Sequence, residues 1–384
     1  MQPANRVVNL PPYPFASLGK RIAELKAQGM DVIRLDIGSP DLPPPQRIID
    51  ALYRSACNPD HHGYGGYYGI PALRQAMADY YQRRFGVTLD PDGEVLPLIG
   101  SKEGIVNIAL AYLDPGDLAL VPDPGYAPYT MGAYLASARV ATFPLLAERD
   151  YLPDLSAIPA EVADEARLIW LNYPNNPTGA TTTLEFLAEA VAFAREHDLL
   201  ICHDAPYCDL TYDGYVAPSI LQVEGAREVA IEFNSLSKLY NMAGWRVGMV
   251  VGNRHVLEAL TRVKTNVDSG IFRAIQDAAI EALTGDQSWL AERNAIYQER
   301  RDIIVAGLAE IGIKVRPPQA SLYVWAPVPE GYTSVEFTTR LLEEQGVSIT
   351  PGTVFGANGE GYMRISLGAA TERIYEAMDR LAAL

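Results

Sequence analysis

The stretch that decides the fold reads Asn234-Ser-Leu-Ser-Lys238-Leu-Tyr-Asn-Met-Ala-Gly244-Trp-Arg246-Val-Gly248. It follows a short apolar run, residues 229–233, which we expect to be a buried strand. Lys238 therefore lies where a strand ends and the chain turns, at the edge where sheets of α/β proteins bind ligands. A lysine among hydroxyl groups, with Arg246 eight residues later, suits an amine nucleophile beside an anion-binding site. The alternative is a surface lysine in a polar loop.

Other short apolar runs alternate with segments of helical periodicity. We expect buried strands at residues 118–121, 168–171, 199–202 and 247–251. Apolar residues four apart, Leu73, Met77, Tyr81 and Phe85, predict one face of a helix. Thr182 and Glu185 match a capping box that opens another helix, and residues 272–311 have a helical pattern with a break near Gly285. The alternation is typical of an α/β protein with a mostly parallel sheet.

The last part of the chain mixes the two element types, with strands expected at 322–326 and 363–367 and helices at 335–345 and 371–384. We therefore predict a proline-rich N-terminal arm that joins a small domain (residues 1–45), a large domain (46–275) and a small C-terminal α+β domain (276–384). No repeat of fixed period is present in the sequence.

Composition excludes several classes of protein. The 384 residues carry 31 Lys and Arg against 47 Asp and Glu, a net charge of −16, which argues against nucleic acid or an anionic membrane as the main partner. Hydrophobic residues make up 48% and charged residues 20%, so the chain can bury a core. Three cysteines without paired spacing argue against a disulfide framework. With no apolar run long enough to span a bilayer and no secretory signal, we expect a cytoplasmic protein.

Polar residues follow two more of the expected strands. Asn172-Tyr-Pro-Asn-Asn176-Pro-Thr-Gly179 comes after the strand at 168–171, although Asn-Pro-Thr-Gly is also good chemistry for a connecting turn. His203-Asp204-Ala-Pro-Tyr207 comes after the strand at 199–202. A buried aspartate needs a cationic partner, and a helix N-cap is the alternative for Asp204. We expect His203 to be a packed side chain, because the histidines show no metal-ligand spacing.

These segments are more informative together than apart. Asn176, Asp204 and Lys238 each follow a different expected strand, so a parallel sheet brings them to one edge. The chain has neither a dinucleotide-binding nor an NTP-binding glycine motif. A lysine, a carboxylate and an anion site suit pyridoxal phosphate (PLP), with its imine carbon, pyridine nitrogen and phosphate. Ser235-Leu-Ser-Lys238 also satisfies the S-x-x-K of penicillin-binding enzymes, but the S-D-N and K-T-G that accompany that motif do not occur.

At this point the sequence resembles a class I/II aminotransferase of PLP fold type I, over nearly the whole chain. The resemblance implies a mostly parallel seven-stranded sheet between helices in the large domain, plus the smaller α+β domain. It implies that Lys238 forms the Schiff base with PLP and that Asp204 pairs with the pyridine nitrogen. Further cofactor-binding residues implied by the resemblance are Ser101, Lys102, Tyr126, Asn176, Tyr207, Ser235, Ser237 and Arg246. Of these, Ser101 and Lys102 precede an expected helix at 103–113, whose N-terminus would bind phosphate.

The same resemblance implies how substrate and a second subunit are bound. Arg364, in Gly361-Tyr-Met-Arg364-Ile-Ser-Leu, would clamp the substrate α-carboxylate with its planar fork of donors. Asn176 would contact both substrate and cofactor, and Gly38 would lie in a loop that closes over substrate. Tyr64 matches a tyrosine that reaches the phosphate of the partner subunit, which implies a homodimer with shared active sites. The alternative for the Tyr- and Gly-rich stretch around Tyr64 is a mobile surface loop.

The implied reaction is a ping-pong transamination between an amino acid and a 2-oxo acid, 2-oxoglutarate being the expected acceptor. Lys238, once displaced from PLP by the incoming amine, would remove the Cα proton and return it to the imine carbon of the cofactor. Tyr207 would assist beside the ring hydroxyl.

Three segments favour one subgroup. Gly100-Ser-Lys-Glu-Gly104, Lys264-Thr-Asn-Val-Asp-Ser-Gly270 and the run from Ala320 to Tyr332 resemble LL-diaminopimelate aminotransferases and their near relatives. Departures from that pattern occur at Ser39, Pro44 and Gly65-Gly66, near the expected substrate mouth. Aspartate, methionine, aromatic amino acids and N-succinyl-diaminopimelate therefore stay open as donors. A PLP-dependent C–S lyase or decarboxylase, and a non-catalytic regulator on the same fold, are the competing functions.

Overall fold

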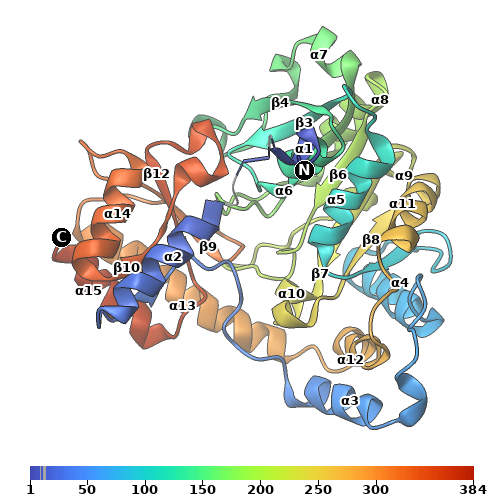
Figure 1. Ribbon diagram of the computed structural model, residues 1–384, viewed down its shortest axis with the longest axis horizontal. Helices are drawn as coiled ribbons and strands as arrows, with labels where there is room; N and C mark the ends of the chain where they lie inside the picture. The colour runs from blue at the N-terminus through green and yellow to red at the C-terminus, as the bar shows by residue number, and fades with distance from the viewer. Residues whose placement is uncertain (9, 12–13) are drawn as a thin grey trace.

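The computed structural model describes residues 1–8, 10–11 and 14–384, without the side chains of residues 14–16. Asn9, Pro12 and Tyr13 of the predicted N-terminal arm lie outside these residues. Within the described chain, a seven-stranded sheet has the order β2-β8-β7-β6-β5-β3-β4 and is covered by helices on both sides (Figure 1). Its strands are β2 (Val95–Leu98), β3 (Leu118–Asp123), β4 (Arg139–Pro144), β5 (Ala166–Asn172), β6 (Leu200–Asp204), β7 (Ala230–Ser235) and β8 (Gly248–Gly252). The predicted fold class is thus confirmed.

The centre of this sheet is parallel and places three strand ends side by side. Strand β5 pairs with β6 so that Asn172 faces Asp204, and β6 pairs with β7 so that Asp204 faces Phe233. Only β8, antiparallel to both β7 and β2, departs from the parallel arrangement in the sheet as described. The β5, β6 and β7 ends therefore form one continuous edge.

Two helical layers bury the sheet. On one face pack α5 (Ser101–Tyr112), α6 (Pro128–Leu135) and α11 (Arg254–Val267), around a core that includes Trp170 and Phe233. On the other face pack α4 (Pro71–Phe85), α8 (Leu184–Glu196) and α12 (Arg273–Thr284). Helix α3 (Gln46–Ala56) packs on α12. The chain also has the short helices α7 (Ala160–Glu165), α9 (Ala226–Val229), α10 (Leu236–Leu239) and α1 (Asn5–Val8), the last of which contacts α6.

A second core lies beside the sheet domain (Figure 1). It holds a three-stranded antiparallel sheet of β11 (Thr350–Pro351), β12 (Tyr362–Ser366) and β9 (Tyr323–Pro327), with α13 (Trp289–Glu310), α14 (Ser334–Gln345) and α15 (Thr371–Ala382). The N-terminal segment joins this core, because β1 (Ile33–Arg34) pairs with β10 (Val347–Ser348) and α2 (Pro14–Ala27) packs Ile22 and Leu25 near Leu342. The domain boundaries at residues 45/46 and 275/276 stay a prediction.

Three sequence expectations about helices need comment. The capping box at Thr182 and Glu185 is wrong by one residue: Thr183 has extended backbone and its side chain accepts from the amide of Phe186, so α8 starts at Leu184. The helix expected from residue 103 starts at Ser101. The break near Gly285 is confirmed, since α12 ends at Thr284 before α13 begins.

Strands β2 and β4 were not expected from the sequence. Proline interrupts the apolar run of β2, and β4 is an edge strand with mostly solvent-facing residues, so neither shows a buried-strand pattern. In the described part of the chain, no helix is long and apolar enough to cross a bilayer.

Candidate active site

A cavity of about 370 Å³ opens at the edge where β5, β6 and β7 end. The predicted residues that line it are Gly38, Ser101, Lys102, Tyr126, Asn176, Asp204, Tyr207, Ser235, Ser237, Lys238, Arg246 and Arg364. They come from both cores and from the N-terminal segment. Among the described residues predicted for the site, Tyr64 alone lies outside the cavity wall, with 92% of its surface exposed.

Lys238 projects into this cavity from α10, directly after β7. Its Nζ donates a hydrogen bond to the carbonyl oxygen of Gly38 and lies 5.9 Å from the ring centroid of Tyr207. Burial, together with the positive charges of Arg364 and Arg246, lowers the pKa of Lys238 to about 7. A large fraction of this amine is therefore unprotonated, and so nucleophilic and basic, at neutral pH. The alternative of a lysine on an open surface is wrong.

Asp204 is the last residue of β6 and is followed by a turn, so the N-cap alternative is also wrong. Its Oδ2 accepts a hydrogen bond from the hydroxyl of Tyr129 at 2.7 Å, while Oδ1 is buried without a hydrogen-bond partner in the described residues. Burial raises the pKa of Asp204 to about 6, although the Tyr129 bond and nearby His203 oppose that rise. A buried carboxylate oxygen without a partner, on a residue that lines a cavity, suits a protonated nitrogen on a bound ring.

His203 is a packed side chain, as predicted. Its Nδ1 lies 2.9 Å from Oε2 of Glu232, and both side chains are fully buried. No cluster of three or more potential metal ligands occurs among the residues described by the structure.

The opposite end of the cavity is built for an anion. Helix α5 points its N-terminus there, with Ser101 and Lys102 in the first turn because the helix begins at Ser101. Gly100 caps this helix with a φ of 74°, and a Cβ at this position would overlap Nη2 of Arg246. A Cβ on Gly248 would lie 2.8 Å from the amide nitrogen of Ser101. Because neither glycine has a side chain, the backbone at the start of α5 can lie close to the Arg246 guanidinium, and both border the same part of the cavity.

Hydroxyl groups complete this end. Ser235 is the N-cap of α10 and accepts from the amide of Ser237 at 3.3 Å. The Ser237 hydroxyl in turn accepts from Nη1 of Arg246 at 3.4 Å. Donors from α5, α10 and Arg246 together suit a phosphate group.

Arg364, on β12, is 3% exposed and brings a guanidinium to the second wall of the cavity. Its Nη1 donates to Oδ1 of Asn176 at 2.9 Å and its Nη2 to the carbonyl oxygen of Asp36 at 2.9 Å. The guanidinium carbon lies 4.1 Å from the ring centroid of Tyr323. A planar cation held from three sides is oriented to bind a carboxylate with two parallel hydrogen bonds.

Tyr207 and Gly38 meet at Tyr323. The hydroxyls of Tyr207 and Tyr323 are 2.8 Å apart, and burial raises the pKa of Tyr207. A Cβ on Gly38 would overlap the hydroxyl of Tyr323, so this position needs glycine for a close approach.

Sequence reasoning missed several residues of the wall. Tyr129, three residues after Tyr126 and in α6, stacks on Trp170 with ring centroids 4.5 Å apart. Asn172 donates to the carbonyl oxygen of Asp204 at 2.6 Å and accepts from the amide of Asn176 at 2.8 Å. Arg34 and Asp36 form a two-bond ion pair at 2.6 Å within the cavity wall. The period-two spacing of Arg34, Asp36 and Gly38 on an extended segment was the available signal.

The donor set fits PLP on observations of this structure alone. A weakly basic primary amine, a buried carboxylate oxygen without a partner, a glycine-lined anion site and a fixed guanidinium share one cavity. These groups match a cofactor aldehyde carbon, a pyridine nitrogen, a phosphate and a substrate carboxylate.

Comparisons with known proteins agree. The family model for class I and II aminotransferases matches residues 30–381. The LL-diaminopimelate aminotransferase of Moorella thermoacetica is 55% identical over 99% of this chain and 98% of its own length, and that of Dehalococcoides mccartyi is 52% identical over 100% and 98%.

Solved structures lead to the same family. Substrate-bound BacF from Bacillus subtilis superposes with a TM-score of 0.96 at 38% identity, covering 100% of this chain and 98% of that one. A single mutant of Thermus thermophilus aspartate aminotransferase superposes with a TM-score of 0.94 at 29% identity, covering 100% and 99%. The chain is therefore a PLP-dependent enzyme that acts on amino acids and 2-oxo acids and belongs to the class I and II aminotransferases.

Proposed function

We propose that this aminotransferase moves an amino group from LL-diaminopimelate to 2-oxoglutarate. The observation that carries a transaminase site is the presence of the Lys238 amine, the unpartnered Asp204 oxygen and the Arg364 guanidinium in one cavity. The donor follows from the relatives, which carry the name LL-diaminopimelate aminotransferase at 48 to 55% identity over almost the full chain.

Each residue has a proposed role toward the cofactor. Lys238 holds PLP covalently through its amine, and Asp204 keeps a proton on the pyridine nitrogen through Oδ1. Asn176 and Tyr207 contact the ring hydroxyl, and Tyr126 stacks on the ring. Phosphate is bound by the first turn of α5 and by the remaining basic and hydroxyl groups, Ser101, Lys102, Ser235, Ser237 and Arg246. PLP, when bound, supplies a protonated ring that withdraws electrons from the substrate Cα.

The protein's own part in the reaction is to orient the amino acid and to move one proton. Arg364 and Asn176 hold the α-carboxylate, which fixes Cα relative to Lys238, and Gly38 lies in the loop over the substrate. Lys238 takes the Cα proton when it is released as a free amine, because a base with a pKa of about 7 is well matched to neutral pH. The Lys238 nitrogen then gives this proton to the imine carbon of the cofactor, which lies on the other side of the transferred amino nitrogen.

We also propose a homodimer with shared sites, and a cytoplasmic location. Tyr64 is 92% exposed in the single chain, next to the exposed Tyr67 and Tyr68. Gly65, in the same stretch, has room only for hydrogen, since a Cβ there would overlap the carbonyl oxygen of Ile271. An exposed aromatic stretch that is hydrogen-bonded to Gln276 of α12 through the Gly65 carbonyl oxygen is suited to reach the phosphate site of a second subunit.

A panel of donors tests the substrate. Purified protein loaded with PLP should form glutamate from 2-oxoglutarate with LL-diaminopimelate, and far more slowly with aspartate, methionine, aromatic amino acids or N-succinyl-diaminopimelate. If the protein prefers one of these other amino acids, the assigned donor is wrong but the assignment as a transaminase stands. If the protein instead releases pyruvate and ammonia from a cysteine conjugate and forms no glutamate, it is a C–S lyase and not a transaminase.

A further inference from the structure

Arg293 is a buried arginine that ends beneath the turn carrying Lys238. It comes from α13, and only 2% of its surface is exposed. Each of its five N–H groups has an acceptor: Nη1 donates to the carbonyl oxygens of Lys238, at 3.2 Å, and Leu239. Nη2 donates to the carbonyl oxygen of Asp209 at 2.8 Å and to Oδ1 of Asn294 at 2.9 Å, and Nε donates to the same Oδ1 at 3.1 Å.

The Lys238 turn needs such a partner. Helix α10 has only four residues, so its last carbonyl groups receive no N–H donor from a following helical turn and would otherwise be buried without a donor. Buried carbonyl groups without donors are costly, and a charged donor satisfies them best. Arg293 therefore fixes the peptide groups that follow Lys238, and with them the direction of the lysine side chain.

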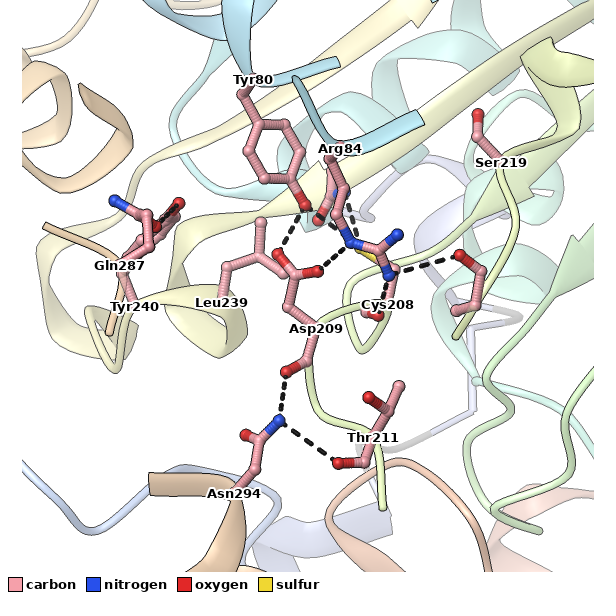
Figure 2. Close-up of polar contacts among 12 residues, drawn as sticks. Tyr80, Arg84, Cys208, Asp209, Thr211, Ser219, Leu239, Tyr240, Gln287 and Asn294 are labelled. Carbon is pink, nitrogen blue, oxygen red and sulfur yellow. Dashed lines mark hydrogen bonds and ion pairs between the residues drawn. The ribbon is translucent and has the colours of Figure 1, made fainter. Parts of the chain in front are cut away.

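Arg293 also joins two parts of the cavity wall. Asp209 follows Tyr207 by two residues, and its carbonyl oxygen accepts from both Arg293 and Asn294. Figure 2 shows the other side of the same loop, where Tyr80 and Arg84 hold the Asp209 carboxylate at 2.8 and 2.7 Å. The loop that carries Tyr207 and the turn that carries Lys238 thus have one cation in common.

We propose that Arg293 is a positioning residue for Lys238, holding the lysine where its nitrogen reaches both ends of the proton transfer. The proposal rests on the role assigned above to Lys238 as the base. A base that serves two carbon atoms in turn has little freedom for error, because a displacement of about 1 Å can cost about 100-fold in rate.

Arg84 provides a matched control. Like Arg293, it is an arginine that donates to a backbone carbonyl in the 207–211 loop, that of Cys208 at 3.2 Å. It also contacts the Asp209 carboxylate, the carbonyl oxygen of Ala217 and the ring of Phe85. In the described chain, none of its hydrogen bonds reaches the Lys238 turn. Arg84→Met and Arg293→Met therefore remove the same charge from the same loop, and only Arg293→Met releases the Lys238 turn.

The experiment measures the first half-reaction of the PLP-loaded enzyme in single turnovers, with L-glutamate bearing hydrogen or deuterium at Cα. We expect Arg293→Met to slow the half-reaction about 10- to 100-fold, with a deuterium effect at least as large as that of the wild type and little change in the glutamate concentration giving half the maximal rate. Arg293→Lys, which retains a cation but not the fork, should fall between. Arg84→Met should lose comparable thermal stability and keep the wild-type half-reaction rate within about threefold.

Equal losses of rate in Arg84→Met and Arg293→Met, or a slowed Arg293 variant without a deuterium effect, would overturn the proposal. If Arg293→Met does not fold, the same comparison of rate and deuterium effect is made between Arg293→Lys and Arg84→Met. Lys238→Ala separates the two levels of inference: if it still exchanges the Cα deuterium at the wild-type rate, the role of Lys238 fails. If it does not, while Arg293→Met and Arg293→Lys match the wild type, only the positioning role fails.

Discussion

Tyr129 donates a hydrogen bond of 2.7 Å to Oδ2 of Asp204, a residue of the cavity wall, and this leaves Oδ1 buried and without a hydrogen-bond partner in the described chain. Tyr129 is fixed by stacking on Trp170, so the carboxylate is held in one orientation. The bond favours the ionised form of Asp204 against the effect of burial. One aspartate oxygen is thus bonded to Tyr129, and the other is the one that the proposed arrangement pairs with the ring nitrogen.

Tyr129→Phe should weaken PLP binding. Without the hydroxyl, the pKa of Asp204 rises further above its present value, and the carboxylate binds a protonated ring nitrogen less well. Removing a hydrogen bond to a charged group costs about 1.5–3 kcal/mol, which is about 10- to 100-fold in the PLP dissociation constant. Titration of the cofactor-free protein with PLP, followed by tryptophan fluorescence, measures it. Tyr173→Phe is the control, because that buried hydroxyl bonds the carbonyl oxygen of Tyr151; equal affinity losses would contradict the account.

Lys238→Met should stabilise the cofactor-free protein, with a defined dependence on pH. The lysine titrates near 10.5 when unfolded and near 7 when folded, so the unfolded chain binds the extra proton between these values. The cost to folding grows as the pH falls from about 10.5 to 7 and is constant below 7. Urea unfolding should therefore show a gain of roughly 2 kcal/mol for the variant at pH 6.5 and a smaller gain at pH 9.5. If the gain in unfolding free energy increases with pH instead, the pKa of Lys238 is not lowered in the folded protein.

Gly100→Ala should damage the phosphate site specifically. The new Cβ would overlap Nη2 of Arg246, on a backbone whose φ of 74° disfavours side chains. We expect at least about 10-fold weaker PLP binding, because both the helix N-terminus and the guanidinium must move. Gly244→Ala is the matched control two residues before Arg246, since nothing lies within 4 Å of its Cβ position in the described structure. If the two variants bind PLP equally well, the close approach of Gly100 to Arg246 is not what the phosphate site requires.

Arg364→Lys should raise the KM for the amino donor about 30- to 100-fold, because a lysine cannot make the two parallel bonds of the guanidinium. The PLP dissociation constant should change less than the KM, since the proposed phosphate donors are untouched and, in the described chain, Arg364 is hydrogen-bonded to only one proposed cofactor contact, Asn176. Steady-state kinetics beside a PLP titration separates these effects. If the variant binds PLP poorly but has a normal KM for the amino donor, Arg364 binds the cofactor and not the substrate carboxylate.

Mixing two inactive variants tests the shared dimer. A Lys238→Ala subunit keeps Tyr64, and a Tyr64→Ala subunit keeps Lys238, so a hybrid dimer contains one site with both residues. Random reassociation should restore about a quarter of wild-type activity, provided that Tyr64→Ala alone is impaired. Activity that stays at the sum of the two parents would argue that each subunit has its own complete site.

Much of this site could be predicted because parallel strands impose a simple rule. Asn176, Asp204 and Lys238 each follow a buried apolar strand, and neighbouring parallel strands end at the same edge. The strands that escaped prediction lack that pattern: β4 is largely exposed, and β2 contains Pro97. The predicted start of α8 was one residue off because three consecutive threonines, 181–183, are equally good caps by residue type, and only backbone geometry selects Thr183.

The contacts that tune the site were not predictable in the same way. Tyr129 reaches Asp204 from α6 by stacking on Trp170 of β5, and a tyrosine on an apolar helix is otherwise ordinary core. Arg293 belongs to a helix rich in arginine and glutamate, where each arginine has the sequence signature of a solvated surface residue. Its five hydrogen bonds go to four acceptor atoms in three separate segments, which sequence spacing does not reveal.

The most direct test of the proposed function is a single-turnover reaction of the PLP-loaded protein with LL-diaminopimelate alone, followed by 2-oxoglutarate. The visible absorbance of the bound cofactor should disappear in proportion to active sites when the amino acid is added. It should return when 2-oxoglutarate is supplied, with one glutamate formed per site, and the Lys238→Ala protein should do neither. Visible absorbance that is unchanged by LL-diaminopimelate but lost with another amino donor would contradict the proposed substrate, and release of ammonia without glutamate would contradict transamination.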